Sequence, residues 1–539
     1  MRKQILISLA LASSLIAKER PNILFIFSDD HSPQAIGAYD GWLKALNPTP
    51  EIDKLAGDGM VFTKSFCTNS ICGPSRAVIM SGKHSHQNGF MNNGNSFNWE
   101  QPIFPKMLRK AGYETALYGK SHLKGTPQGF DHWSVLPGQG LYYNPDLITP
   151  EGKKMVQGHC TDVVTDLALE FLEEKRNSEK PFLLMVQHKA PHRNWMPAPR
   201  HLSLYEEVTI PEPPTLFDNY QDNAPPARHQ ETEIDRHMGL NFDLFVDLTP
   251  DFVDPDPSVS VDRSGWANMK RMTPEQLATW RNFYGPRDEA FHKAQLSGKE
   301  LVSWKFQQYV KNYLRCIKGV DESVGRLRQK LEELGLSENT LVIYSSDQGF
   351  FLGEHGWFDK RWMYDESMMM PFIASWPGKI EPGTTSKALI QNLDYAPTFL
   401  TAAKAIVPEE MQGHSLTPLF ESKGKKPTGW RSELYYHYYE YPSVHMVPRH
   451  YGIRTERYKL MHFYQFGDEW EFYDLKEDPD EQHNLYHEKS AQPAIEATRK
   501  QLVKLRESYA DNSDVSEKSK EWQKQVRSGR AKRLQTAGD

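Results

Sequence analysis

Cysteine is scarce in this chain, which has four cysteines among 539 residues: Cys67, Cys72, Cys160 and Cys316. So few thiols exclude a disulfide scaffold as the source of stability for a chain of this length. No two of them are separated by only two residues, so the paired spacing of a structural zinc site is absent too. If Cys72 is consumed chemically, at most one disulfide remains.

An excess of one charge is also missing. The formal net charge is −6 and charged residues make up 25% of the chain. These values exclude a general electrostatic affinity for nucleic acid, so no nucleic-acid partner is expected. An anionic ligand would have to be held by a few cations at defined positions.

Long apolar runs are absent except near the N-terminus, where residues 5–16 are mostly apolar and follow Arg2 and Lys3. This pattern is typical of a cleaved signal peptide over residues 1–17, and it predicts export to the periplasm or to the extracellular space. An N-terminal membrane anchor is the alternative, but the run is shorter than the ~20 residues that a spanning helix needs. We therefore expect no transmembrane span.

The length exceeds that of one typical domain, so a large unit and a smaller one are expected. Pro, Gly and charge-rich segments divide the chain into a signal peptide, a catalytic domain with one insertion, a linker, a C-terminal subdomain and a charged tail: 1–17, 18–421 with insertion 211–264, 422–429, 430–510 and 511–539. The insertion is rich in Pro and Asp. It is either a plain surface loop or a wall of the substrate cleft.

The C-terminal subdomain shows the alternation of a small antiparallel sheet. Strands are expected over 451–461 and 470–475, followed by a helix over 493–508. The tail beyond Tyr509 is expected to be loose.

Four short apolar runs in the large unit are bounded like buried strands and stop at residues that can do chemistry. The runs 22–28, 113–118, 181–187 and 341–346 lead into Asp29-Asp30, Lys120-Ser121-His122, His188-Lys189 and Asp347-Gln348. In open α/β sheets, ligands bind at the carboxyl ends of the strands, so these four ends are expected to converge on one site. Any one of these strand ends, taken singly, is explained more simply as the start of a solvated loop.

The polar residues at these ends fall into two chemical sets. Asp29, Asp30, Asp347 and Gln348 offer hard oxygen ligands, which suit Ca²⁺ or Mg²⁺ better than zinc. Lys120, Lys360 and Arg76 supply cations. A divalent metal beside several cations is suited to a compact anion such as sulfate or phosphate.

Cys72 begins the segment Cys72-Gly73-Pro74-Ser75-Arg76, which leads into a predicted short helix with Pro74 in its first turn. A thiol at a helix N-terminus is reactive, although a buried structural cysteine explains the position equally well. A cysteine phosphatase needs five residues between its Cys and Arg, and here there are three.

With these residues the chain resembles the type I sulfatase family of the alkaline-phosphatase-like superfamily. Cys72-x-Pro74-Ser75-Arg76 matches the maturation signature of that family, and residues 81–89 match its continuation. Further matches to its metal pairs, its sulfate-binding segment and its C-terminal subdomain are residues 29–30, 347–349, 112–122, 454–459 and 472–475. The resemblance implies an α/β fold with a large mixed sheet flanked by helices, and a smaller C-terminal subdomain with an antiparallel sheet plus a helix.

The resemblance also implies cofactors and roles. A maturation enzyme would oxidise Cys72 to formylglycine, and Ca²⁺ would be bound by Asp29, Asp30, Asp347, Gln348 and the modified Cys72. Arg76 would hold the nucleophile, Lys120 and Lys360 the sulfate, and His122 would be the base that releases sulfate. His188 is the first candidate for the leaving-group acid and Lys189 the second, since Lys189 stands where many members have His. Gln348 departs from the usual Asn but keeps an amide oxygen.

The segment 353–364 resembles the sulfatase branch that acts on 6-O-sulfated N-acetylglucosamine. It makes His355, Asp359 and Arg361 the expected substrate contacts and a sulfated sugar or glycan the expected partner. Asp359 and Arg361 could instead simply pair with each other on the surface. A phosphate or phosphonate ester hydrolase of the same superfamily and a non-catalytic glycan-binding relative are the alternative functions.

Overall fold

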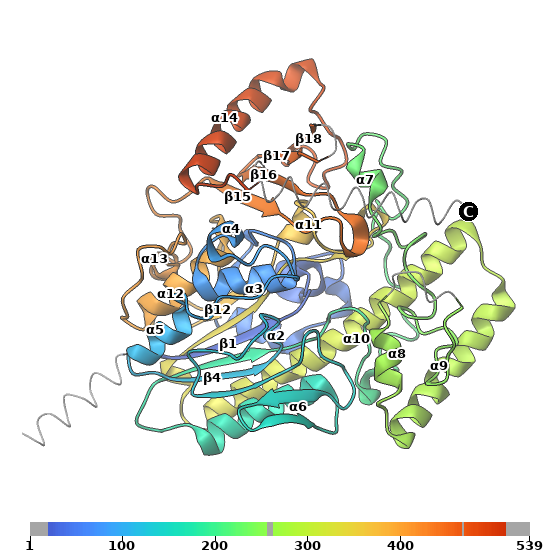
Figure 1. The fold of residues 1–539 in the computed structure, drawn as a ribbon, viewed down its shortest axis with the longest axis horizontal. Coiled ribbons are helices and arrows are strands. Elements are labelled where there is room, and N and C mark those ends of the chain that lie inside the picture. Colours follow the sequence, from blue (N-terminus) through green and yellow to red (C-terminus); the bar gives the residue numbers. More distant parts are fainter. Residues whose placement is uncertain (1–19, 256–261, 466–467, 514–539) are drawn as a thin grey trace, which may run out of the picture.

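The computed structural model describes residues 20–255, 262–465 and 468–513 (Figure 1). The predicted signal peptide and most of the predicted tail lie outside these residues. Within them, no helix is both long enough and apolar enough to cross a membrane.

The catalytic unit is built on one ten-stranded mixed sheet in the order β13-β2-β12-β9-β1-β8-β4-β5-β6-β7. The bounds of these strands, in that order, are Thr384–Ser386, Met60–Phe62, Phe372–Ser375, Thr340–Ser346, Asn22–Ser28, Phe182–Gln187, Glu114–Gly119, His132–Val135, Asp146–Thr149 and Gly152–Met155. The central strands β9, β1, β8 and β4 are parallel, so their carboxyl ends lie at one edge of the sheet. Two short pairs lie outside this sheet: β10 (Phe351–Leu352) with β11 (Phe358–Asp359), and β3 (Ser65–Phe66) with β14 (Ile390–Gln391).

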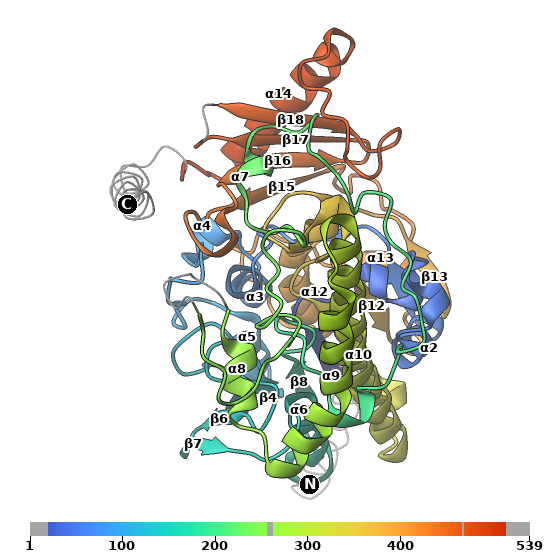
Figure 2. The same cartoon turned by 90° about the vertical axis from the view of Figure 1, so that its right-hand side faces the viewer.

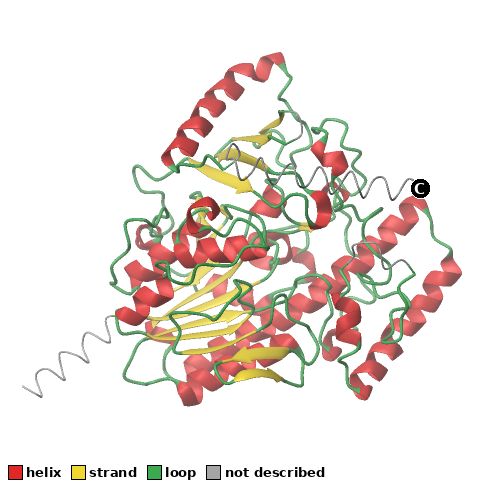
Figure 3. Cartoon of the chain, viewed as in Figure 1, coloured by secondary structure: helices red, strands yellow, loops and turns green. Residues whose placement is uncertain are grey.

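Helices cover both faces of the large sheet (Figures 1 and 3). Strand β1 explains why, because its side chains alternate between two apolar clusters and both must be shielded from water. Ile23, Phe25 and Phe27 pack with α3 (Cys72–Ser81), α5 (Phe104–Lys110) and α12 (Tyr395–Ala402). Leu24 and Ile26 pack with α2 (Pro50–Gly57), α6 (Cys160–Glu170) and the long α10 (Gly298–Glu333).

The C-terminal subdomain lies above the large sheet in Figures 1 and 2. Its four strands form an antiparallel sheet, β15 (Glu433–Tyr438), β16 (His450–Thr455), β17 (Tyr458–Phe463) and β18 (Glu469–Asp474), packed by α14 (Gln492–Ser508). The segment predicted as one strand over 451–461 is thus two strands joined by a tight turn. The predicted α/β architecture with a small antiparallel-sheet-plus-helix subdomain is confirmed.

The remaining helices are short, apart from α9. They are α4 (Ser85–Asn88), α7 (Pro226–His229), α8 (Ser264–Met269), α9 (Pro274–Ala294), α11 (Asp365–Met368) and α13 (Thr417–Glu421). All four cysteines are buried and free, so Cys160 and Cys316 do not pair. Asp511, placed by the sequence in a loose tail, is instead buried and accepts a hydrogen bond from the Tyr435 hydroxyl at 2.6 Å.

Candidate functional site

Three carboxylates meet where β1 and β9 end. Asp29, Asp30 and Asp347 are fully buried, and each offers an oxygen within 4.8 Å of the other two. The backbone N–H of Asp30 donates to Asp347 Oδ1 at 3.0 Å, which joins the two strand ends. Burial raises the pKa of Asp30 to about 7, although the Lys360 ammonium opposes the shift. Such a cluster favours a bound cation, because its carboxylates repel one another.

Two oxygens of this cluster lack a hydrogen-bond partner among the described residues. They are Oδ1 of Asp29 and Oε1 of Gln348, and both are buried. The amide nitrogen of Gln348 donates to Asp30 Oδ1, which fixes the side chain against the carboxylates. Buried oxygens without donors are costly unless a ligand satisfies them.

Each carboxylate also faces one basic side chain. The Lys120 ammonium donates to Asp29, the Lys360 ammonium donates to Asp30 Oδ2 at 2.5 Å, and Arg76 Nε donates to Asp347 Oδ2 at 2.9 Å. Burial lowers the pKa of Lys120 well below its ordinary value. Burial acts against the charge of Lys360 as well, but Asp30 and Asp359 raise its pKa. The site therefore places three basic side chains beside three carboxylates, which is a setting for an anionic ligand.

Cys72 is the first residue of α3 and is 1% exposed. Its Sγ lies 3.7 Å from the amide nitrogen of Asn93 and 4.0 Å from that of Gln139. Burial raises the pKa of the thiol, and the Lys360 charge only partly offsets this. A Cβ at position 73 would come within 2.6 Å of Asn93 Oδ1, so a larger residue there would require the Asn93 side chain to shift. Neither Asn93 nor Gln139 was predicted from the sequence, because both lie in irregular loops.

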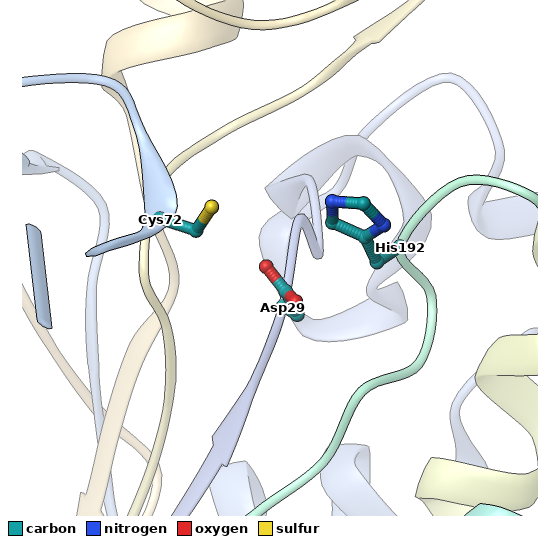
Figure 4. A group of neighbouring side chains, drawn as sticks. All are labelled: Asp29, Cys72 and His192. Carbon is teal, nitrogen blue, oxygen red and sulfur yellow. The ribbon is translucent and has the colours of Figure 1, made fainter. Parts of the chain in front are cut away.

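His192 joins the site although the sequence did not single it out as a site residue. Asp29, Cys72 and His192 each have a ligand-type atom within 4.8 Å of the others, and their side chains are turned toward one another (Figure 4). His192 Nε2 lies 3.9 Å from Asp30 Oδ2. Burial lowers the pKa of His192 well below its ordinary value, and Lys120 lowers it further.

The two candidates at the end of β8 differ in position. His188 Nε2 lies 3.0 Å from the hydroxyl of Ser323 on α10, and burial lowers the pKa of His188 to about 4. The structure therefore places His188 against the helices that cover the sheet. The Lys189 ammonium lies 4.8 Å from the centre of the Tyr142 ring and has no hydrogen-bond partner among the described residues. Its charge also lowers the pKa of Lys120, after the effect of burial, so the two side chains lie in the same region.

His122 lies beside the start of α3. Its carbonyl oxygen would be 3.3 Å from a Cβ at position 73, and its Nδ1 is buried without a partner within the described ranges. Burial and the Lys120 charge lower the pKa of His122 well below its ordinary value. Both effects favour the neutral imidazole.

Asp359 ends β11, and Lys360 and Arg361 follow it. Asp359 Oδ1 accepts from the Lys360 backbone N–H at 2.8 Å and from the Arg361 guanidinium. Despite burial, Arg361 and Lys360 hold the pKa of Asp359 well below its ordinary value. The pair is not a surface ion pair, because Asp359 is 3% and Arg361 7% exposed.

His355 does not join this group. Its Nδ1 lies 3.1 Å from Asp218 Oδ2 in the insertion, and its ring packs against Trp357 and Tyr364. Burial acts to lower the pKa of His355, but the bond to Asp218 raises it. The structure thus places His355 under the loop that carries Asp359.

Several of these residues adopt left-handed backbone conformations. Positive φ values occur at Asp30, His122, His355, Asp359 and Arg361. Each costs roughly 1–3 kcal/mol for a residue other than glycine, and such strain typically gathers at functional sites.

Comparisons with known proteins agree on one family. A family model described as Sulfatase matches residues 21–405, and one described as N-sulphoglucosamine sulphohydrolase, C-terminal, matches residues 353–508. The chain is 46% identical to an N-acetylglucosamine-6-O-sulfatase of Bacteroides thetaiotaomicron over 504 residues, 93% of this chain and 88% of that protein. It is 28% identical over 448 residues to the N-acetylglucosamine-6-sulfatase of Homo sapiens, 78% of this chain and 67% of that protein. A protein solved in complex with its substrate D-glucosamine-2-N,6-O-disulfate superposes with a TM-score of 0.88 and 46% identity, over 92% of this chain and 100% of that one.

Proposed function

Because the chain belongs to the sulfatase family and is a sulfuric ester hydrolase, we propose that it removes the 6-O-sulfate from N-acetylglucosamine or a related glucosamine unit of a sulfated glycan. The observation that carries this proposal is the 46% identity, over nearly the whole chain, to an N-acetylglucosamine-6-O-sulfatase. The family resemblance and the alkaline-phosphatase-like fold predicted from the sequence are confirmed.

We propose that Asp29, Asp30, Asp347 and Gln348 hold Ca²⁺ beside the modified Cys72. The residues fit such an ion: the ligand atoms are oxygens, three carboxylates lie within 4.8 Å of one another, and two buried oxygens have no hydrogen-bond partner within the described ranges. When bound, the ion would draw charge from a sulfate oxygen and lower the pKa of a neighbouring hydroxyl.

We propose further that Cys72 is oxidised to formylglycine by a maturation enzyme. The modified side chain, as its hydrate, would supply one hydroxyl to attack sulfur and a second whose deprotonation releases sulfate. The chain's own residues would then position the sulfate ester and neutralise its charge. Arg76, on α3, is fixed against Asp347. Lys120 and Lys360, which bond to Asp29 and Asp30, would contact the sulfate oxygens. Nδ1 of His122 is free of partners in the described structure and would accept the proton beside Cys72.

For the leaving-group acid, the geometry favours Lys189 or His192 over His188. His188 bonds to Ser323 on α10, whereas the Lys189 ammonium and the His192 ring lie on the side of the carboxylates. A group that donates a proton to the sugar oxygen must lie within reach of it. His188 therefore takes no part in proton donation in the proposed mechanism.

At the sugar end, we propose that Asp359 and Arg361 contact ring hydroxyls. A carboxylate beside a guanidinium can accept from one hydroxyl and donate to the next, which distinguishes an equatorial from an axial 4-hydroxyl. The buried, charged state of both side chains supports this role.

The test is turnover of the matured protein on a panel containing N-acetylglucosamine-6-sulfate, galactose-6-sulfate, a 2-O-sulfated uronic acid and a phosphate diester. We expect turnover of the glucosamine substrate with a preference over galactose-6-sulfate. Preference for the galacto sugar or the uronic acid would refute the substrate, and hydrolysis of the phosphate diester alone would favour the phosphoesterase alternative.

We also propose that the protein is exported, on the basis of the apolar run over residues 5–16. Amino-terminal sequencing of the protein from its native host tests this: an intact Met1 in the mature protein would contradict cleavage after residue 17.

A further inference from the structure

The insertion over 211–264 reaches the sugar end of the site through its backbone. The Phe358 N–H donates to the Thr232 carbonyl at 2.8 Å, and the Ile234 N–H donates to the Gly356 carbonyl at 2.9 Å. On the other side, the Glu231 N–H donates to the His445 carbonyl at 2.7 Å. The insertion therefore joins the loop that carries Asp359 to a loop of the C-terminal subdomain.

A buried ion pair strengthens this junction. Arg193 donates from Nε and Nη2 to the two carboxylate oxygens of Asp243 at 2.6 and 2.7 Å. Asp243 lies in the insertion and also accepts from the Gly239 N–H and the Asn194 amide, both at 2.8 Å. With both side chains buried, the fork geometry fixes the guanidinium in one orientation.

The third nitrogen of Arg193 decides the tautomer of His445. Arg193 Nη1 lies 3.0 Å from His445 Nε2, and since an arginine only donates, Nε2 must accept. His445 Nδ1 lies 2.7 Å from the Glu231 carbonyl, which only accepts, so Nδ1 carries the proton. His445 is thus held neutral, with its lone pair on Nε2.

The same edge of the His445 ring lies beside Asp359. His445 Nε2 lies 3.3 Å from Asp359 Oδ2, while Asp359 Oδ1 is already taken by the Lys360 N–H and by Arg361. With its proton on Nδ1, His445 cannot donate to Oδ2. Among the described residues Oδ2 accepts no hydrogen bond, so it remains open to a donor from outside the protein.

We propose that Arg193, locked by Asp243 of the insertion, is a positioning residue for sugar recognition: it holds His445 in the Nδ1–H tautomer and so keeps Asp359 Oδ2 open to accept from a sugar hydroxyl. The inference rests on the proposed function, because it assumes that Asp359 contacts the sugar.

Protonation of His445 would close this acceptor. A proton on Nε2 would be donated to Asp359 Oδ2 and would face the Arg193 cation. The charged and titratable groups around the ring are Asp359, Arg361, Arg193 and His237. Burial lowers the pKa of His445, Asp359 acts against this, and Arg361 and Arg193 lower it further. The acceptor therefore stays open at neutral pH and is lost only as acid protonates the ring.

The experiment compares Arg193→Met and Asp243→Asn with wild type. Arg200→Met is the matched control, because Arg200 makes a similar two-pronged pair with Asp162, at 2.7 and 2.8 Å, away from the site. KM and kcat are measured from pH 5 to 8 on N-acetylglucosamine-6-sulfate and on an aryl sulfate that has no sugar. The tautomer and pKa of His445 are read by ¹⁵N NMR of histidine-labelled protein, with His445→Gln to assign the signal.

For Arg193→Met we expect KM on the sugar sulfate to rise by roughly tenfold, with kcat and aryl sulfate turnover changed by less than about threefold. The acid-side increase in KM should move to higher pH, together with the pKa of His445. Arg193→Lys should recover part of the loss, because it restores the charge without the fork. Asp243→Asn should also raise KM on the sugar sulfate and loosen the His445 tautomer, because Arg193 loses its anchor, and Arg200→Met should change neither readout.

An unchanged His445 tautomer and pH profile in Arg193→Met would overturn the inference, as would an equal loss on both substrates. If Arg193→Met does not fold, Asp243→Asn decides by the same NMR readout. Wild type that hydrolyses the aryl sulfate but not the sugar sulfate would refute the proposed substrate and, with it, the sugar-binding part of this inference. The tautomer measurement would still decide the role of Arg193 toward His445.

Discussion

Replacement of Asp359 by Asn removes one negative charge from the sugar end of the site with little change in shape. The φ angle of Asp359 is 78°, a left-handed conformation that Asn tolerates better than Ala does. Asn therefore separates the loss of charge from added backbone strain. It can still accept at one oxygen, as Asp359 Oδ1 does from the Lys360 N–H at 2.8 Å.

Two free energies follow from the contacts of Asp359. A charged hydrogen bond to a sugar hydroxyl is worth about 1–3 kcal/mol, so kcat/KM on N-acetylglucosamine-6-sulfate should fall by roughly 10- to 200-fold. Arg361 is 7% exposed and would lose its ionic partner. Removing one partner of a buried pair costs about 3–5 kcal/mol of stability, so thermal unfolding should occur at a lower temperature. A surface ion pair could be broken with no change in stability, but this buried pair should not behave in that way.

The assay is kcat/KM on the sugar sulfate and on an aryl sulfate, below the unfolding temperature of the variant. Lys360 remains in place, so the aryl sulfate should be hydrolysed at close to the wild-type rate. A variant equally active on the glucosamine substrate would refute the role of Asp359. So would an equal loss on both substrates, which would place its effect at the sulfate.

Further predictions concern the nucleophile, the metal and the acid. Cys72→Ser, made where the host matures only Cys, should fold but lose nearly all turnover, because serine has one hydroxyl and would stay sulfated; an unmodified Cys72 thiol in peptide mass spectra of active wild type would contradict this. Chelation should abolish activity and Ca²⁺ restore it, while Asp347→Ala should not be rescued; full activity of metal-free protein would exclude the ion. His192→Asn should lower kcat by about 100-fold or more, whereas His188→Asn should retain kcat and lose about 1 kcal/mol of stability at pH 7.5. Because burial lowers the pKa of His188 from 6.5 to about 4, stability from the neutral ring is complete above pH 6.5 and lost as pH falls toward 4. The difference in unfolding free energy between wild type and His188→Asn should therefore shrink with acid, and a difference that grows would contradict the assignment.

The central strands could be predicted because each is marked by a short pattern of consecutive residues in the sequence. The run 22–28 coincides with β1, and 341–346 lies within β9, since buried strands are short, apolar and end in charge. That their ends share one edge follows from parallel pairing. It could therefore be predicted from the sequence that Asp29, Asp30 and Asp347 lie close together.

The position of His188 was also open to prediction, from the period of two in a strand. Leu184 and Val186 belong to the apolar cluster with α6 and α10, and His188 continues their side, whereas Gln187 accepts from Arg76 at 3.4 Å on the other. His192, Asn93 and the contacts of His355 with the insertion could not be found in this way. They depend on loops whose path is set by packing between segments far apart in the chain.

Strand β1 lies between two partners that are made long after it. Asn22 pairs with Thr340, 318 residues later in the chain. At ~5–20 residues per second, synthesis of the intervening chain takes roughly 15–60 s, during which the apolar β1 has no β9 to pair with. Nascent chains stalled before residue 340 should therefore remain sensitive to protease throughout the region of β1, and early resistance there would show that another segment protects it. When the chain is expressed at a high level, we expect incompletely folded chains to aggregate through the unpaired β1.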